Sequence, residues 1–189
     1  MTTLAPTLST RYFPRSAAWM RNLLLVFSGA ILVSLFAQVK TPLPFTPVPL
    51  TGQTFAVLLV GATLGSKRGA ASLTLYAALG ALGLPIFAGG AAGMAYLSGA
   101  TFGYLLGFVV AAFVIGRLAE RGLERNLRTS IIPFFVGTLV IYAFGAGWLA
   151  LLFGVEKALA IGALPFIIGD TIKLVLAALA LPAAWKLVK

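Results

Sequence analysis

The chain alternates between long apolar stretches and short polar connections. Six apolar segments are evident, at residues 22–39, 51–65, 69–84, 99–116, 131–153 and 162–185. A helix needs about 20 predominantly apolar residues to cross the hydrocarbon core of a bilayer. The pattern therefore predicts membrane-spanning helices rather than the short alternating strands of a soluble sheet protein.

Two of the six predictions need separate arguments. The segment 22–39 follows Arg11, Arg15 and Arg21, so a cleaved signal peptide is the alternative interpretation. Because the run is near spanning length and further apolar segments follow it, we interpret it as a true helix. The segments 51–65 and 69–84 are short and join at the polar turn "GSKRG". We expect them to form a tilted helical hairpin that the flanking loops extend.

Composition supports a membrane protein. The chain is 60% hydrophobic and 10% charged, with a mean hydropathy of +1.04. An average soluble domain is about 45–50% apolar and about 25% charged. So much apolar surface cannot be hidden in the core of a chain this short. We therefore expect an all-α integral membrane protein of one domain, residues 1–189, with six transmembrane helices.

The basic residues predict the orientation of these helices. Cytoplasmic loops of membrane proteins carry an excess of Lys and Arg. When the connections are assigned alternately to two sides, one side has only Lys40 and Lys157. The other side holds these residues: Arg11, Arg15, Arg21, Lys67, Arg68, Arg117, Arg121, Arg125, Arg128, Lys186 and Lys189. We expect a multi-pass protein of the cytoplasmic membrane, with residues 1–20 and the C-terminus in the cytoplasm.

Two external connections are unusual. The segment 40–55, "KTPLPFTPVPLTGQTF", has four prolines, which fix φ and cannot donate backbone hydrogen bonds, so it is predicted to be stiff extended chain. The segment 83–104 is rich in glycine, which allows close approach of backbone to a neighbour or ligand. Both are too apolar for solvated linkers. We expect ordered loops that fold together as a lid or floor; simple helix-connecting turns are the alternative.

The missing residue types exclude several functions. The sequence has no cysteine and no histidine, which removes the thiol nucleophile, the commonest general base and the commonest transition-metal ligand. The acidic residues are Glu120, Glu124, Glu156 and Asp170. We expect neither an enzyme nor a metal or cofactor site. The net charge of +10 falls between apolar runs, so we do not expect nucleic-acid binding. No phosphate loop is present, so any ATP hydrolysis belongs to another chain.

Asp170 and Lys173 are the only charges in the last apolar segment. Their spacing of three places them on one helix face, and charged groups at membrane depth should face the protein interior. Three explanations are open: a structural ion pair, a proton or sodium site, and a ligand site. We favour the ligand site, because the external loops end at the same level of the membrane.

Other candidate ligand contacts lie at that level. Thr51, Gln53 and Thr54 are polar, and Gln53 can both donate and accept hydrogen bonds. A loop-capping amide is the alternative role for Gln53. Tyr76 and Tyr104 can stack on a ligand or simply pack in the bundle. These alternatives stay open from the residues alone.

At these residues the chain resembles the BioY family, the substrate-binding membrane components of energy-coupling-factor (ECF) vitamin transporters. The likeness runs from about residue 42 to 180. It rests on "PFTPVPLTGQTF", "GLPIFAGG", "GATFGYLLGF" and "IIGDTIKLVLAAL", which occur in that order. This combination is specific, whereas any one of these elements alone is weak.

The resemblance implies six helices, high-affinity capture of biotin from outside, and energisation by a transmembrane coupling subunit and two ATPase subunits. Biotin has a ureido group with two N–H donors and a carbonyl acceptor, which Asp170 and Lys173 can satisfy. Its apolar bicyclic ring would be covered by loop residues. The substrate-binding residues expected are Thr51, Gln53, Phe87, Gly89, Gly90, Tyr104, Asp170 and Lys173.

Two other functions remain as alternatives. The first is a substrate-binding component for a different vitamin, because the same architecture would serve. The second is a structural or assembly protein of the membrane, in which Asp170 and Lys173 join helices. Ligand binding distinguishes among all three.

Overall fold

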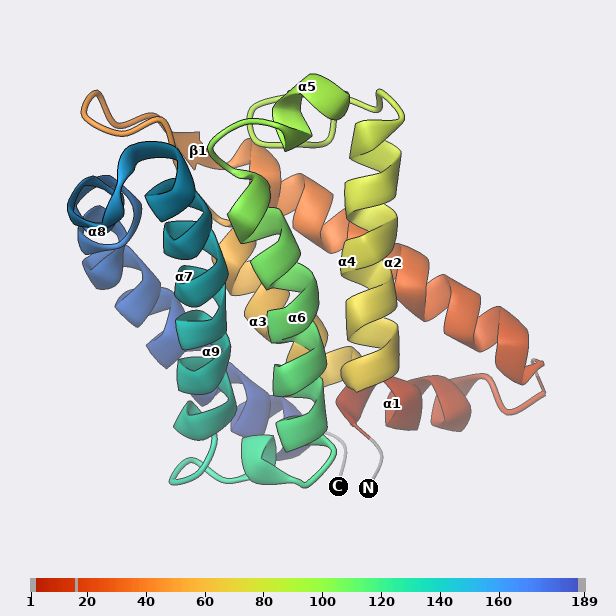
Figure 1. The fold of residues 1–189 in the computed structure, drawn as a ribbon. Coiled ribbons are helices and arrows are strands. Elements are labelled where there is room, and N and C mark those ends of the chain that lie inside the picture. The colour runs from red at the N-terminus through yellow and green to blue at the C-terminus, as the bar shows by residue number, and fades with distance from the viewer. Residues whose placement is uncertain (1–2, 16, 187–189) are drawn as a thin grey trace.

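The computed structural model describes residues 3–15 and 17–186 (Figure 1). It is a bundle of helices, and the α-helices of the described chain are α1 Leu4–Tyr12, α2 Ala18–Gln38, α3 Gln53–Leu64, α4 Ser66–Ala81, α5 Met94–Leu97, α6 Phe102–Ala119, α7 Ile131–Phe153, α8 Val155–Gly162 and α9 Ile167–Lys186. Short 3₁₀ turns lie at η1 Leu123–Arg125 and η2 Leu164–Phe166. The predicted segment 131–153 coincides with α7, and the other predicted segments overlap α2, α3, α4, α6 and α9.

The centre of the bundle is formed by α3 and α6. Figure 1 shows α6 between α7 and α4, with α3 behind it and the strongly tilted α2 beside α4. Eight of the 12 residues of α3 are buried and none is exposed, which explains why its sequence is apolar on all sides. By contrast, α2 leaves large apolar side chains exposed, among them Leu24, Ile31 and Leu35. Such a surface fits lipid rather than water.

Four helical stretches of the described chain are long and apolar enough to cross a membrane: α2, α6, α7 and the stretch Val155–Lys186 that contains α8 and α9. Of the two short predicted helices, α3 has 12 residues and α4 has 16. They form the hairpin expected at "GSKRG", where Gly65 turns the chain with a φ of +83°. That φ favours glycine, because a Cβ would be strained there.

Two connections differ from the all-α prediction. Segment 40–55 was predicted to be extended chain without helix, but its last three residues begin α3, and β1 Lys40–Thr41 pairs with β2 Leu50–Thr51 as an antiparallel hairpin. The pairing was not predicted, because strands of two residues give no alternating pattern. Segment 83–104 was predicted as a loop, yet it contains α5 and the start of α6. The second connection is bonded to the end of α2: the Gly89 N–H donates to the Ala37 carbonyl, and the Gln38 side chain donates to the carbonyls of Ile86 and Phe87. The Lys40 side chain of the first connection lies beside Gly89.

The two ends of the bundle differ in the number of basic residues that they carry. At the lower end of Figure 1 lie α1, the α3–α4 turn, the α6–α7 connection and the end of α9, which carry most of the predicted cytoplasmic Lys and Arg residues. We call this the basic end; Lys189 lies outside the described residues. Arg15 lies between α1 and α2, and Arg21 lies in the first turn of α2. The opposite end, the hairpin end, holds the β-hairpin, α5 and α8. Helix α1, which was not predicted, lies across the basic end with Leu4 and Pro6 buried.

Gly116 of α6 lies in close contact with the α3–α4 turn, so a larger residue at this position is expected to destabilise the protein. A Cβ built there would lie 2.2 Å from the Ser66 nitrogen and 2.4 Å from the Gly65 carbonyl carbon, which are backbone atoms of the α3–α4 turn. Gly116→Ala is therefore expected to force the hairpin away from α6 and to lower the free energy of unfolding by about 1–3 kcal/mol. The melting temperature of the purified protein in detergent measures this.

Gly147→Ala is the matched control, because a Cβ at Gly147 has no heavy atom within 4 Å. Alanine also has a better helix propensity than glycine. The control should melt at the wild-type temperature or above it. Equal melting temperatures for the two variants would contradict the packing argument.

Candidate ligand-binding site

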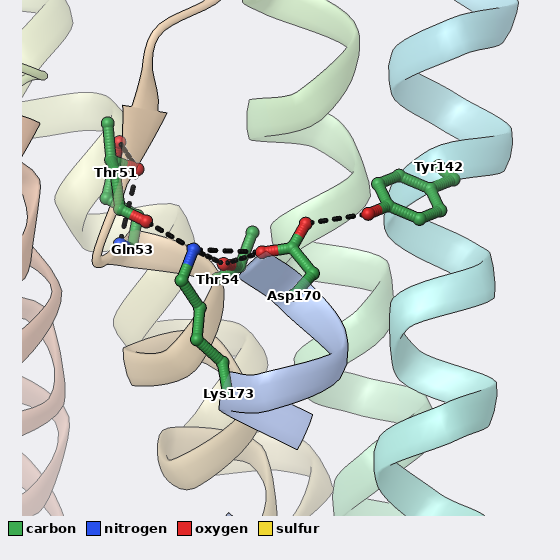
Figure 2. Close-up of polar contacts among 6 residues, drawn as sticks. All are labelled: Thr51, Gln53, Thr54, Tyr142, Asp170 and Lys173. Carbon is green, nitrogen blue, oxygen red and sulfur yellow. Dashed lines mark hydrogen bonds and ion pairs between the residues drawn. The ribbon is translucent and has the colours of Figure 1, made fainter. Parts of the chain in front are cut away.

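The first turns of α9 carry Asp170 and Lys173 on the side that faces α3 (Figure 2). The three-residue spacing aligns the two side chains on one helix face, as predicted. The Lys173 Nζ lies 2.9 Å from the Asp170 Oδ1, and both side chains are largely buried. A charged group this deep in an apolar bundle is stable only when it is paired and hydrogen-bonded.

The Asp170 carboxylate joins three helices. Its Oδ1 accepts from the Thr54 hydroxyl of α3 at 2.7 Å and from Lys173 of α9, and its Oδ2 accepts from the Tyr142 hydroxyl of α7 at 2.8 Å. A carboxylate has about four acceptor positions. Three are used here, so Oδ2 can accept one further hydrogen bond.

The Lys173 ammonium has no donor to spare. It donates to the Thr51 carbonyl at 2.6 Å, to the Thr54 hydroxyl at 3.0 Å and to Asp170. An ammonium has three N–H groups, so all are occupied. A ligand oxygen can take a hydrogen bond from Lys173 only by sharing or replacing one of these partners.

Gln53 extends the polar network toward α4. Its Nε2 donates to the Tyr76 hydroxyl at 2.7 Å, and its Oε1 accepts from the Thr51 hydroxyl at 3.2 Å. The amide is buried. One N–H and one acceptor position of this amide remain available for a ligand.

A cavity of about 40 Å³ lies beside these groups. Its lining residues are Val48, Pro49, Leu50, Thr51, Gln53, Thr54, Tyr96, Thr101, Tyr104, Leu105, Phe108, Ile141, Tyr142, Phe166, Asp170 and Lys173. Apart from Thr101, the polar lining residues belong to the network around Asp170 and Lys173, and the rest of the lining is apolar or aromatic, a composition typical of small-molecule sites. Ligand pockets usually measure about 300–1,000 Å³, so a drug-sized ligand requires lining residues to move apart.

The predicted site residues fall into two groups. Thr51, Gln53, Tyr104, Asp170 and Lys173 all line the cavity. The remaining three, Phe87, Gly89 and Gly90, are not among its lining residues.

Phe87 and its neighbours instead support the loop beside the cavity. The Phe87 ring is fully buried and stacks on Tyr96, with 4.8 Å between ring centroids. Gly89 and Gly90 turn the chain at positive φ. This segment therefore positions Tyr96, which does line the cavity.

Tyr104 is held in a fixed position on the cavity wall. Its hydroxyl donates to the Gly162 carbonyl at the end of α8. The ring packs against Gly145 of α7, where a Cβ would lie 2.2 Å from the Tyr104 Cε1. The tyrosine is thus enclosed by α7 and α8 and has little freedom to move away from the cavity.

Sequence reasoning missed Tyr142 and Tyr96. Tyr142 is a hydroxyl-bearing residue in the long apolar run of α7, and this was the available signal. The run itself does not show which face of α7 meets Asp170, so the sequence could not show that Tyr142 belongs to the site. Thr54 was noted as polar at this level, but its role between Asp170 and Lys173 was not predicted.

Comparisons with known proteins identify relatives of this chain. A sequence model of the BioY family matches residues 6–189. The "Probable biotin transporter BioY" of Pyrococcus horikoshii is 45% identical over 142 residues, which cover 75% of this chain and 82% of the relative. The "Biotin transporter BioY" of Thermotoga maritima is 39% identical over 155 residues, covering 82% and 88%.

A solved structure shares the fold. The crystal structure of the S-component for biotin from an ECF-type ABC transporter superposes with a TM-score of 0.80. The two sequences are 26% identical, and the match covers 88% of this chain and 92% of that one.

Proposed function

The chain belongs to the BioY family, and we propose that it binds biotin with high affinity and takes it up across the cytoplasmic membrane as the S component of an ECF-type ABC transporter. It is a multi-pass membrane protein and not an enzyme. The relatives reported above are named as biotin transporters, and the solved structure is described as an S-component for biotin.

The observation that supports biotin most directly is the spare acceptor on Asp170 beside a narrow apolar cavity. The ureido group of biotin offers two N–H donors on a flat bicyclic ring. One N–H can fill the free position on the Asp170 Oδ2, and Gln53 can accept from the other. A site that hydrogen-bonds such a group rejects analogues without it, because its own buried polar atoms would stay unpaired.

The ureido carbonyl requires a donor. Lys173 provides one if its bond to Thr51 or Thr54 is shared with the ligand, and Gln53 has a free N–H. The rings of Tyr104 and Tyr96 would cover the bicyclic ring. Because the cavity is small, we expect the segment 83–101 to rearrange on binding, and contact of Phe87, Gly89 and Gly90 with the ligand would require that rearrangement.

We further propose one transmembrane domain with six spans: α2, α3, α4, α6, α7 and α9. The basic end would lie in the cytoplasm, in accord with the positive-inside rule. Helix α3 is only about 18 Å long at 1.5 Å per residue, so the β-hairpin segment would complete its crossing. The site would then open to the outside. A coupling subunit and two ATPase subunits would supply energy.

Calorimetric titration of the ligand-free protein in detergent tests the function. We expect one-to-one binding of biotin with a nanomolar Kd, which corresponds to about −12 kcal/mol. Desthiobiotin keeps the ureido group and lacks the thioether ring, so it should bind more weakly. Thiamine has no ureido group and should not bind.

Two results would contradict this proposal in different ways. Binding of thiamine in preference to biotin would leave the assignment as a vitamin-transport component in place and change the assigned substrate. No heat and no thermal stabilisation by any of these ligands, on protein shown to be folded, would favour the structural role of the ion pair.

A further inference from the structure

A second cleft lies at the basic end, far along the bundle from the biotin site. Its volume is about 290 Å³. It lies where the starts of α2 and α4 meet the end of α6, and three cations line it: Lys67, Arg68 and Arg117. One carboxylate, that of Glu120, is also part of the lining.

The carboxylate of Glu120 is already occupied. Its Oε1 accepts from the Ser66 N–H and hydroxyl, both at 2.8 Å, and its Oε2 lies 3.5 Å from the Arg117 Nη1. Burial raises the pKa of Glu120, but these partners outweigh burial and bring the pKa below its usual value. Glu120 therefore stays ionised at neutral pH, and the cleft as a whole remains positive.

Two cations of the cleft are left for a ligand. In the described part of the chain, neither Lys67 nor Arg68 lies within ion-pair distance of a carboxylate. The Arg68 Nε donates to the Asn22 Oδ1 at 2.9 Å, which fixes the guanidinium plane and leaves its terminal N–H donors available. A planar guanidinium with free parallel donors matches the oxygens of a phosphate group.

The cleft changes from charged to apolar along the helices. Val26 and Ala71 also line it, one turn further into the bundle than Asn22 and Lys67. The adjacent surface of α2 exposes Leu23 and Phe27. This gradient follows the shape of a phospholipid, with its charged headgroup at the interface and its acyl chains in the membrane.

We propose that this cleft binds the phosphate of an anionic membrane phospholipid, with Arg68 and Lys67 as its cationic partners. Arg117 contributes charge at the rim of the cleft, since its side chain is 63% exposed. The apolar turn at Val26 and Ala71 receives the start of the acyl chains. Basic pockets between helices on the cytoplasmic side are suited to anionic headgroups. This inference does not depend on the substrate of the other site.

The test compares two lipids of identical acyl chains on the whole protein. Purified protein in detergent is titrated with phosphatidylglycerol or phosphatidylcholine, and native mass spectrometry counts retained lipids while melting temperature is followed. We expect one phosphatidylglycerol to be retained preferentially and to raise the melting temperature. Arg68→Gln should weaken its binding at least tenfold.

Arg121→Gln is the matched control, since Arg121 is exposed at the same end and does not line the cleft. It removes the same charge and should bind the lipid as the wild type does. Lys67→Gln is a second cleft variant for the case that Arg68→Gln fails to fold, because Lys67 is an exposed side chain. It should also weaken lipid binding.

Inorganic phosphate and glycerol 3-phosphate distinguish a lipid site from a general phosphate site. We expect neither to raise the melting temperature at the lipid concentrations used. Protection by free phosphate equal to that by phosphatidylglycerol would overturn the lipid assignment. Equal lipid binding by Arg68→Gln, Lys67→Gln and Arg121→Gln would overturn the site itself, because the attraction would then come from general charge.

Discussion

Asp170→Asn is expected to weaken biotin binding at least tenfold. The substitution replaces the carboxylate that accepts from Thr54, Tyr142 and Lys173 by a neutral amide. The amide nitrogen donates instead of accepting, so the spare acceptor position on Oδ2 is lost. It also leaves the largely buried Lys173 ammonium without its counter-charge, and breaking a buried pair costs about 3–5 kcal/mol. Calorimetry gives the Kd, and the melting temperature in detergent gives the loss of stability.

The double variant Asp170→Asn with Lys173→Met separates binding from structure. It removes both charges, and methionine fills much of the space of the lysine stem. Stability should recover relative to Asp170→Asn, because no unpaired charge remains in the bundle. Biotin binding should not recover. If the double variant binds biotin as tightly as the wild type, Asp170 and Lys173 serve only to join α3, α7 and α9.

Gly145→Ala is expected to reduce biotin affinity by roughly tenfold to a hundredfold. The new methyl group would overlap the Tyr104 ring, which cannot withdraw because its hydroxyl is bound to the Gly162 carbonyl. The ring must then move into the cavity that it lines. Overpacking of this kind costs about 1–3 kcal/mol. If the bound state carries this cost, the affinity for biotin falls by roughly tenfold to a hundredfold. Calorimetry with biotin measures it.

Gly147→Ala is the control on the same helix. It makes the same chemical change two residues away, where a Cβ meets nothing within 4 Å. It should bind biotin with the wild-type Kd. Identical affinities for the two alanine variants would show that Tyr104 does not form the wall of the biotin site.

The sequence alone predicted the features that depend on local pattern. The class of protein follows from composition, and α7 from an uninterrupted apolar run. The α3–α4 hairpin follows from a polar turn with glycine at Gly65. The shared face of Asp170 and Lys173 follows from their spacing of three on a helix. Each of these needs only neighbouring residues and the periodicity of a helix.

Other features of the site came from the resemblance to a known family. Composition and spacing gave no reason to prefer biotin over another vitamin. The ordered motifs from 42 to 180 supplied that substrate, and the relatives now support it. The resemblance also suggested Phe87, Gly89 and Gly90 as ligand contacts, which remain predictions because these residues do not line the cavity.

Only the tertiary structure decided which side chains meet. The Thr54–Asp170 bond joins residues 116 positions apart, and the Tyr142–Asp170 bond joins residues 28 apart on different helices. Such contacts depend on the rotation and axial offset of α3, α7 and α9 relative to one another. Close approaches such as Gly145 of α7 against Tyr104 of α6, and Gly116 of α6 against Ser66 at the α3–α4 turn, pack α7 and the α3–α4 hairpin on α6, and no local pattern contains them. The sequence thus determined a buried pair of charges, and helix packing determined their partners.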